Sequence, residues 1–336
     1  MRYESTDTAR PLVTVLGASG FVGTAVVREF AAHPVRLRLV SRRPAAVPAN
    51  AVAEAEVCTA DLTRPGAIAA AVRGSDVVIQ LVAYINGPST WRVEEGDKAA
   101  ERVNLGLVRE LVAVLREQGR TTGPPPVVVF AGSLSQAGVP RSALLSDETP
   151  DEPVTVYDRQ KLEAERELVA ATEAGVLRGI TLRLPTVYGA GVGPSTLERG
   201  VVAAMMRRAL AGEPLTMWHD GTVARDLVCV DDVARAFAAA VDHADALAGR
   251  RWLIGSGEAT RIGDLFHRIA AVVAARTGRP PVPVVSTAST QAGASDLFDV
   301  VCGSTAFGDL TGWSPRTDLA TALEAAVRRF ELERAG

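Results

Sequence analysis

Residues 12–24 read LVTVLGASGFVGT, a short apolar and β-branched run that leads directly into three glycines. The run Leu12–Leu16 predicts a buried parallel strand, and the apolar periodicity after the glycines predicts a helix. Gly17 permits a tight turn off the strand, Gly20 lets the backbone approach a pyrophosphate, and Gly23 lets helix and strand pack closely. A purely structural turn can carry the same glycines, but the free N–H groups and positive end of the helix favour an anion. The stretch therefore predicts a dinucleotide site.

Composition limits the classes of protein to which the chain can belong. It has 336 residues, 47% hydrophobic and 22% charged, which predicts one large α/β domain or two closely joined ones. A net charge of −3 gives no support for nucleic-acid binding. Cys58, Cys229 and Cys302 are few and far apart, which indicates reduced thiols. Because neither a signal peptide nor roughly 18 consecutive apolar residues occur, we expect a cytoplasmic protein without membrane contact.

A second strand is predicted at Val35–Val40, about twenty residues beyond the glycines. It ends in Ser41, Arg42 and Arg43, where a fold that selects NAD usually carries Asp or Glu for the ribose 2′-hydroxyl. Serine and two arginines suit a 2′-phosphate instead. The same charges also fit a solvated loop, but the position favours NADP(H).

Strands and helices alternate through the rest of the first half, which predicts a doubly wound parallel sheet of the Rossmann type. Further strands are expected at 53–59, 76–83, 127–130 and 177–184, and helices at 62–73, 98–118 and 199–210. The second half is less regular, with short strands within 215–232 and helices at 233–244 and after 260. We expect a flexible leader at 1–10, an NADP-binding Rossmann domain at 11–190, and a smaller C-terminal α/β substrate-binding lobe at 191–336. Some segments of this lobe are expected to return to the main sheet, and the cleft between the two parts would hold a substrate.

Tyr157 and Lys161, in YDRQK, begin another predicted helix. Residues four apart project from one helical face, so the phenol and the ammonium can share a site. A nearby cation would lower the pKa of Tyr157 toward neutrality and make it a usable acid or base. Such pairs also arise by chance on solvated helices, but a neighbouring dinucleotide site favours catalysis.

Two serines follow the strand predicted at 127–130, at the end of the sheet where ligands bind in this architecture. Ser133 and Ser135 are both candidates to bind a carbonyl oxygen. Either serine could instead only cap the strand end.

These motifs together resemble the extended short-chain dehydrogenase/reductase family of nucleotide-sugar enzymes, the NAD-dependent epimerase/dehydratase family. The resemblance rests on GASGFVG at 17–23, the serine after the fifth strand and YDRQK at 157–161. Further marks are VIQLVA at 78–83, Asn104, RLPTVYG at 183–189, RDLVCVDD at 225–232 and TGWSPRTDL at 311–319. Within the family the chain is most similar to dTDP-4-keto-6-deoxyhexose 4-ketoreductases of antibiotic deoxysugar pathways.

The resemblance implies roles for individual residues. Tyr157 would donate a proton, Lys161 would bind the nicotinamide ribose, and Ser133 rather than Ser135 would be the catalytic serine. Implied cofactor contacts are Gly17, Ser19, Gly20, Phe21 and Val22 at the pyrophosphate, Arg42 with Ser41 and Arg43 at the 2′-phosphate, Asp61 and Leu62 at the adenine, Leu81 and Ala83 along the cofactor, Asn104, and Pro185 and Val187 at the nicotinamide. Implied substrate contacts are Ser133, Ser135, Tyr157, Trp218 and Arg225. Arg225 would grip a diphosphate, unless it pairs with Asp226, and Trp91, Trp218 and His219 also fit core packing.

The implied reaction is NADPH-dependent reduction of the C4 ketone of a dTDP-4-keto-6-deoxyhexose, including 2,6-dideoxy sugars. Dehydration is disfavoured, because Leu134 and Ser135 stand where dehydratases carry Asp-Glu. Near the C-terminus the family often carries Asp before a serine, whereas this chain carries Gly303 before Ser304. Alternatives are an epimerase with recycled, bound NAD, and a non-catalytic NADP-sensing or scaffold protein on the same fold. The resemblance implies a homodimer through the Tyr157 helix, and the spacing of the histidines predicts no metal site.

Overall fold

The computed structural model describes residues 10–84, 93–120, 122–139, 142, 144–190, 200–287 and 297–335, without the side chains of the last four. The predicted leader, apart from residue 10, and Trp91 lie outside the described residues. No helix among the described residues is long and apolar enough to cross a membrane.

A seven-stranded parallel sheet forms the centre of the molecule. Its strands are β1 (Leu12–Leu16), β2 (Arg36–Ser41), β3 (Glu54–Thr59), β4 (Val77–Gln80), β5 (Val127–Ser133), β7 (Arg178–Leu184) and β12 (Arg250–Leu253). The spatial order is β12-β7-β5-β4-β1-β2-β3. The order reverses between β1 and β4, which creates the crevice where doubly wound sheets bind ligands. The predicted Rossmann fold is confirmed.

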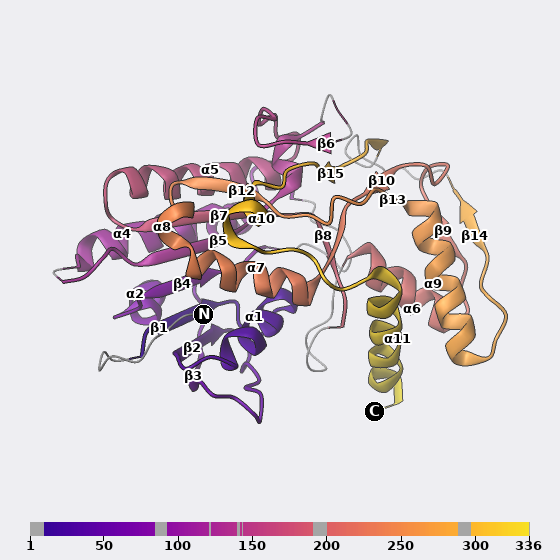
Figure 1. The fold of residues 1–336 in the computed structure, drawn as a ribbon, viewed down its shortest axis with the longest axis horizontal. Coiled ribbons are helices and arrows are strands. Elements are labelled where there is room, and N and C mark those ends of the chain that lie inside the picture. The colour runs from indigo at the N-terminus through magenta and orange to yellow at the C-terminus, as the bar shows by residue number, and fades with distance from the viewer. Residues whose placement is uncertain are drawn as a thin grey trace.

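Helices cover both faces of this sheet (Figure 1). On one face, α2 (Ala67–Val72), α4 (Leu107–Gln118) and α5 (Val156–Glu173) share a core with Val78, Val128 and Phe130. On the other face, α1 (Phe21–Ala31) and α7 (Val230–Asp242) pack on Val15, Ile79 and Val129. Alternate residues of each strand thus enter opposite cores, which explains why the strands read as continuous apolar runs.

A second core lies beside the sheet, where Figure 1 shows α6, α9 and α11 grouped near the C-terminus. It is formed by α6 (Val201–Ala211), α9 (Ile262–Thr277), α11 (Leu319–Ala335), β9 (Leu215–Met217) and β14 (Val284–Ser286). The remaining elements are α3 (Lys98–Glu101), the π-helix η1 (Arg102–Gly106), the 3₁₀-helix η2 (Leu134–Ala137), α8 (Ala244–Leu247), α10 (Ala306–Thr311), β6 (Leu144–Leu145), β8 (Thr186–Tyr188), β10 (Ala224–Arg225), β11 (Leu227–Cys229), β13 (Thr260–Arg261) and β15 (Val301–Cys302). Strand β12 and helix α7 belong to the main sheet and its cover although they follow residue 190. The domain boundary near residue 190 stays a prediction.

The buried carboxylate of Asp232 connects helix α7, which covers the sheet, to the segment that precedes α11. It accepts hydrogen bonds from the backbone N–H groups of Arg316 and Thr317, at 3.2 and 3.0 Å. The indole of Trp313 donates to the carbonyl of Asp232 at 3.0 Å. Two motifs from the sequence, RDLVCVDD and TGWSPRTDL, are therefore joined by hydrogen bonds.

Several predicted elements differ in extent from the structure; among them, the helices expected at 62–73 and 233–244 are Ala67–Val72 and Val230–Asp242. The strand expected at 76–83 ends at Gln80, and the strand expected at 127–130 continues to Ser133 because it pairs with β7 along its whole length. The helix expected at 98–118 contains a π-turn at Arg102–Gly106.

Gly23 offers a test of how closely α1 approaches the turn after β1. A Cβ atom at this position would lie 2.1 Å from the carbonyl oxygen of Gly17, which is backbone and cannot move aside cheaply. We expect Gly23→Ala to lower the free energy of unfolding by about 1–3 kcal/mol, measured by urea denaturation.

Gly106→Ala is the matched control, because it also adds a methyl group to a helical glycine. Its Cβ would first meet the flexible side chain of Arg102, at 3.3 Å. This variant should stay within about 1 kcal/mol of the wild type. Equal losses in the two variants would contradict the close packing at Gly23.

Candidate active site

The glycine turn between β1 and α1 is shaped to receive an anion. Gly17 has φ +92°, and a Cβ there would meet the backbone of Leu81 and Val82 at 3.3 Å. Gly20 is the N-cap of α1, has no side chain to cap it, and no acidic residue lies in the first turn. The N–H groups that begin the helix therefore have no capping side chain, which fits the pyrophosphate of a dinucleotide. Ser19 is buried, whereas Phe21 and Val22 are half-buried at the start of the helix.

The end of β2 presents two exposed arginines, Arg42 and Arg43, next to a buried serine. The hydroxyl of Ser41 donates to the carbonyl of Arg43 at 2.7 Å. Because its one proton is used in this bond, Ser41 is available to a phosphate only as an acceptor. The arginines are the groups at this strand end that can pair with a 2′-phosphate.

The predicted adenine contacts lie at the end of β3. One carboxylate oxygen of Asp61 accepts hydrogen bonds from the hydroxyl and the N–H of Thr63, at 2.7 and 3.0 Å. These bonds, with a smaller effect of Arg42, lower the pKa of Asp61. Leu62 is buried beside it.

The residues after β4 lie between the glycine turn and α5. The N–H of Leu81 donates to the carbonyl of Leu16 at 3.0 Å, and Leu81 and Ala83 are half-buried. Asn104, in the π-turn η1, accepts from the N–H of Tyr84 and donates to Gln160 of α5, both at 2.8 Å. The amide of Asn104 is thus engaged at both ends by the protein, and its contact with a cofactor stays a prediction.

Tyr157 and Lys161 lie on the buried face of α5, against the end of β5. The ammonium of Lys161 donates to the carbonyl of Ala131 at 2.9 Å. It lies 4.5 Å from the ring centroid of Phe130 and 5.8 Å from that of Tyr157. The structure therefore brings both predicted residues to one place, at the carboxyl end of the sheet.

The pKa values of this pair differ from the sequence prediction. Burial, and to a smaller degree the neighbouring Asp158, raise the pKa of Tyr157 instead of lowering it. Burial also lowers the pKa of Lys161 to about 7. The predicted lowering of the tyrosine pKa was therefore wrong, because the loss of hydration and the neighbouring Asp158 both favour the protonated phenol.

The structure places Ser133 and Ser135 in one hydrogen-bonded chain. Ser133 ends β5 and is the N-cap of η2. Its Oγ lies 2.7 Å from the Oγ of Ser135, whose hydroxyl donates to Asp158 at 2.5 Å. The two serines therefore act as a coupled pair, and the choice between them stays a prediction.

A buried network beneath the serines was missed by the sequence analysis. The amide oxygen of Gln136 accepts from the N–H of Ser133 at 2.8 Å, and its nitrogen donates to Glu165 at 3.1 Å. Glu165 and Asp151 both pair with the guanidinium of Arg183, which is 1% exposed. Arg183 lies in the RLPTVYG motif, which was the one signal in the sequence for this network.

The remaining predicted residues come from the segments after β7 and β9. Pro185 and Val187 are half-buried, and Val187 pairs with Val228 of β11. Arg225 donates to the carbonyls of Ala224, at 3.0 Å, and Phe298.

Asp226, which follows Arg225, accepts hydrogen bonds from the backbone. The carboxylate of Asp226 accepts from the N–H groups of Ser256, Gly257 and Cys302. Trp218 is half-buried directly after β9. The roles of Arg225 and Trp218 toward a substrate stay predictions.

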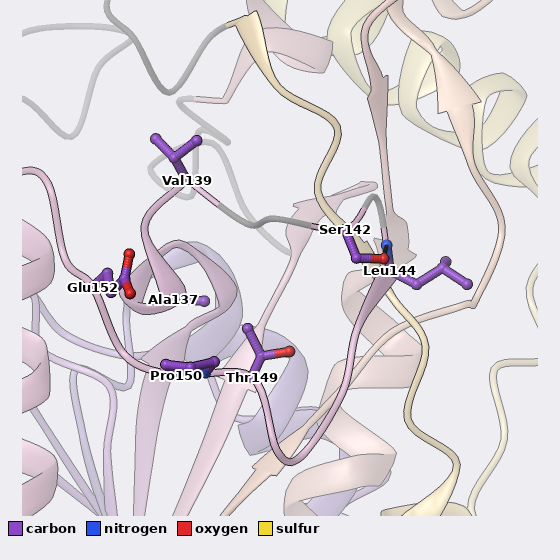
Figure 2. Close-up of a pocket in the computed structure, with 7 residues that line it drawn as sticks. All are labelled: Ala137, Val139, Ser142, Leu144, Thr149, Pro150 and Glu152. Atoms are coloured by element: carbon purple, nitrogen blue, oxygen red, sulfur yellow. Dashed lines mark hydrogen bonds between the residues drawn. The ribbon is translucent and has the colours of Figure 1, made fainter.

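Two cavities lie near this region. Figure 2 shows the lining of one of them, beside the end of η2. Its volume, about 120 Å³, is below the range of about 300–1,000 Å³ usual for ligand pockets. The other, about 650 Å³, lies along β12, α5 and α10. Neither is lined by Ser133, Tyr157 or Lys161.

Known proteins resemble this chain in sequence and in fold. The dTDP-L-rhamnose 4-epimerase of Burkholderia thailandensis is 28% identical over 91% of each chain. The dTDP-6-deoxy-L-talose 4-dehydrogenase (NAD(P)(+)) of Kitasatospora kifunensis is 28% identical over 94% of each. The epimerase structure from Methanothermobacter thermautotrophicus superposes with a TM-score of 0.81 at 18% identity, covering 98% of this chain and 95% of that one.

The sequence also matches a family model over most of the region that forms the sheet. The model is described as the NAD dependent epimerase/dehydratase family, and it matches residues 13–255. That span runs from β1 to the residues just after β12 and includes the glycine turn, the two serines and the Tyr157–Lys161 pair. The chain belongs to the NAD dependent epimerase/dehydratase family.

Proposed function

We propose that this chain is an NADPH-dependent reductase of the C4 ketone of a dTDP-linked 4-keto-6-deoxyhexose, in the biosynthesis of antibiotic sugars. The observation that carries the proposal is the end of β2, where exposed arginines stand in place of a carboxylate. A carboxylate there would accept hydrogen bonds from a ribose and repel a 2′-phosphate, whereas guanidinium groups attract the phosphate. Cells keep the NADP pool mostly reduced, so an enzyme that binds NADPH is suited to the net reduction of a ketone.

Tyr157 is suited to donate a proton to the C4 oxygen. Because its raised pKa keeps the phenol protonated, the group enters the reaction as an acid. The protonated form of Lys161, held by the carbonyl of Ala131, would stabilise the phenolate that remains after proton transfer. Ser133 would donate a hydrogen bond to the same oxygen as negative charge develops there. When bound, the nicotinamide supplies the hydride.

The relatives support the class of substrate. Two curated relatives that align over more than nine-tenths of the chain are named for dTDP-linked 6-deoxy sugars. Arg225 is our candidate for the diphosphate, since a guanidinium can bind two phosphate oxygens at once. We also propose a homodimer through α5, on the resemblance to the family.

The main alternative is a 4-epimerase that retains NAD, which the relative from Burkholderia thailandensis favours by name. Such an enzyme must first remove a proton from the substrate hydroxyl, so Tyr157 would have to act as a base before it acts as an acid. A non-catalytic NADP-sensing or scaffold protein would not need Tyr157, Lys161 and Ser133 in one cluster. Retained NAD in the purified protein would favour the epimerase.

Arg42 provides the test of cofactor choice. We expect calorimetric titration to show tighter binding of NADPH than of NADH. Arg42→Ala should weaken NADPH binding about tenfold or more and leave NADH binding nearly unchanged, because one charge-assisted contact is lost. Arg116→Ala, which removes an exposed arginine from α4, is the control and should bind both cofactors as the wild type does. A wild type that prefers NADH would overturn the proposed cofactor.

Tyr157→Phe tests the reaction itself. With NADPH and a dTDP-4-keto-6-deoxyhexose, we expect the variant to lose at least about 100-fold in kcat, because the proton donor is removed. Loss of NADPH absorbance gives the rate, and the binding of NADPH should be little changed. Full turnover by the variant would rule out Tyr157 as the donor.

The buried ammonium of Lys161 makes folding stability depend on pH. In the folded protein its pKa is about 7, whereas a lysine in the unfolded chain titrates near about 10.4. Between these values the unfolded state binds more protons, so Lys161 contributes stability that rises with pH, by up to about 1.4 kcal/mol per pH unit.

Lys161→Met removes this titration and keeps an apolar stem of similar length. Urea unfolding from pH 7 to 9 should show the free energy of unfolding of the wild type rising relative to that of the variant. A difference that is constant over this range would mean that Lys161 stays protonated while buried.

A further inference from the structure

Asp158 is a buried carboxyl group that the proposed reaction does not yet use. It follows Tyr157 in the first turn of α5 and is 3% exposed. Its side chain points away from solvent, between η2 and the N-cap of α5, and the Ser133–Ser135 pair approaches it from η2. Its position in the sequence, inside YDRQK, predicts no role for it.

Four polar groups form a continuous hydrogen-bonded chain at this place. The hydroxyl of Thr155 donates to one carboxylate oxygen of Asp158, at 2.6 Å, and that of Ser135 donates to the other, at 2.5 Å. The Oγ atoms of Ser135 and Ser133 lie 2.7 Å apart. The chain therefore runs from the carboxyl group to the serine at the end of β5.

Counting protons fixes the direction of each bond when Asp158 is ionised. A carboxylate can only accept, so Ser135 must give its single proton to Asp158. The bond between the serines must then be donated by Ser133, whose own proton points at Ser135. In this state the hydroxyl of Ser133 has no proton left for a ligand.

The directions reverse when Asp158 is neutral. A protonated carboxyl group can donate to Ser135, and Ser135 can then donate to Ser133. Ser133 accepts from Ser135 and keeps its own proton free, so it can donate to an oxygen placed beyond the end of β5. One added proton on Asp158 therefore changes Ser133 from a donor to Ser135 into a donor to a ligand oxygen.

We propose that Asp158 is a positioning residue that, through Ser135, sets whether the hydroxyl of Ser133 donates to Ser135 or to the carbonyl oxygen of the substrate. The inference rests on the proposed function, in which Ser133 meets that oxygen. Neutral Asp158 is the form that supports reduction.

The surroundings of Asp158 favour the neutral form more than those of an exposed carboxyl group do. Burial raises its pKa, and the hydrogen bonds from Ser135 and Thr155 oppose this rise. Arg159, on the same helix, also opposes it, although its guanidinium bonds outward to Glu95 and to the carbonyl of Val154. Tyr157 is coupled to Asp158 as well. From η2 and the turn before α5, the groups that reach Asp158 are the neutral hydroxyls of Ser135 and Thr155.

Asp158→Asn separates this proposal from a merely structural role. The Asn amide can accept from Thr155 and donate to Ser135, so it imitates the neutral carboxyl group at every pH. We expect kcat of the wild type to fall as pH rises through the pKa of Asp158, and Asp158→Asn to hold the low-pH value without this fall. Asp158→Ala, which can neither donate nor accept, removes the acceptor that draws the proton of Ser135 and leaves the direction of the bond between the serines unset. It should therefore also lose the fall in kcat with pH, with a kcat between the low-pH and high-pH limits of the wild type.

Glu163→Gln is the matched control, because it removes a carboxylate from a partly exposed position on the same helix. It should keep the pH profile of the wild type. If Asp158→Asn kept that profile too, or had a kcat well below the low-pH value of the wild type, the relay would be wrong. Lower thermal stability of Asp158→Asn and Asp158→Ala, with the dependence of kcat on pH unchanged in both, would likewise leave Asp158 only a structural role.

A titration that needs no turnover separates failure of the relay from failure of the proposed function. Carbon-13 NMR of protein labelled at its aspartate carboxyl groups, with Asp158→Asn to assign the signal, gives the pKa of Asp158 directly. We expect a value above about 3.9, which Ser135→Ala raises further because a hydrogen bond to the ionised form is lost. A value at or below the ordinary one, unmoved by Ser135→Ala, would overturn the relay. A wild type that reduces no 4-keto sugar, yet shows the raised and coupled pKa, would overturn the proposed function and support the link between Asp158 and Ser135.

Discussion

The buried guanidinium of Arg183 is the constraint on which the arrangement around the site depends. A charge that is 1% exposed must be neutralised within the protein, because an unpaired ion in such a place costs several kcal/mol. Glu165 supplies one carboxylate from the middle of α5, and Asp151 supplies another from the chain that precedes it. Since Arg183 lies in β7, these ion pairs join α5 and the chain before it to the sheet, beside the apolar contacts of the same helix. Gln136 continues the network from Glu165 to the N–H of Ser133, so the same charge pair also holds the end of β5.

The position of α5 then determines the electrostatics of Tyr157 and Lys161. Once the helix lies against β5, both side chains lose their hydration. The pKa of Tyr157 rises and that of Lys161 falls, so the neutral form of each group is favoured. A hydrogen bond to the carbonyl of Ala131 and a cation–π contact with the ring of Phe130 compensate in part for the hydration that the ammonium of Lys161 loses on burial. Packing that serves stability therefore also decides which protonation state each group brings to a reaction.

The sequence predicted those parts of the fold and site that depend on short stretches of chain. The strand, glycines and helix at 12–31 are adjacent, so spacing alone predicts the turn and its three glycines. The face shared by Tyr157 and Lys161 follows from helical periodicity in the same way. The extra length of β5 was not predictable, because Gly132 and Ser133 become strand only by pairing with Arg183 and Leu184 of β7.

Long-range contacts account for what the sequence analysis missed. The link from Gln136 through Glu165 to Arg183 joins positions 29 and 18 residues apart, and no local pattern marks it. The direction of the Tyr157 pKa was wrong for a related reason, because spacing reveals the nearby cation but not the depth of burial. Asp158 lies inside the motif that identified the site, but its partner Ser135 comes from another element.

A reductase and an epimerase on this fold make different demands on the protons of the site. Both reactions pass through a ketone at the same carbon, so both need an acid or base and a hydrogen-bond donor beside one oxygen. An epimerase must take a proton from that oxygen and later return it, so its tyrosine must be stable in both forms. A reductase needs only to give the proton. Burial next to Asp158 keeps the phenol of Tyr157 protonated, but a raised pKa also makes it a weaker acid, so an effect that stabilises the phenolate would help the transfer. Because Ser133 is connected to the same carboxyl group through Ser135, one aspartate adjoins both groups that would meet the oxygen. A proton held on Asp158 would spare Tyr157 the repulsion of a carboxylate as its phenolate forms, and would also free Ser133 to donate. The two effects act together in the direction of reduction.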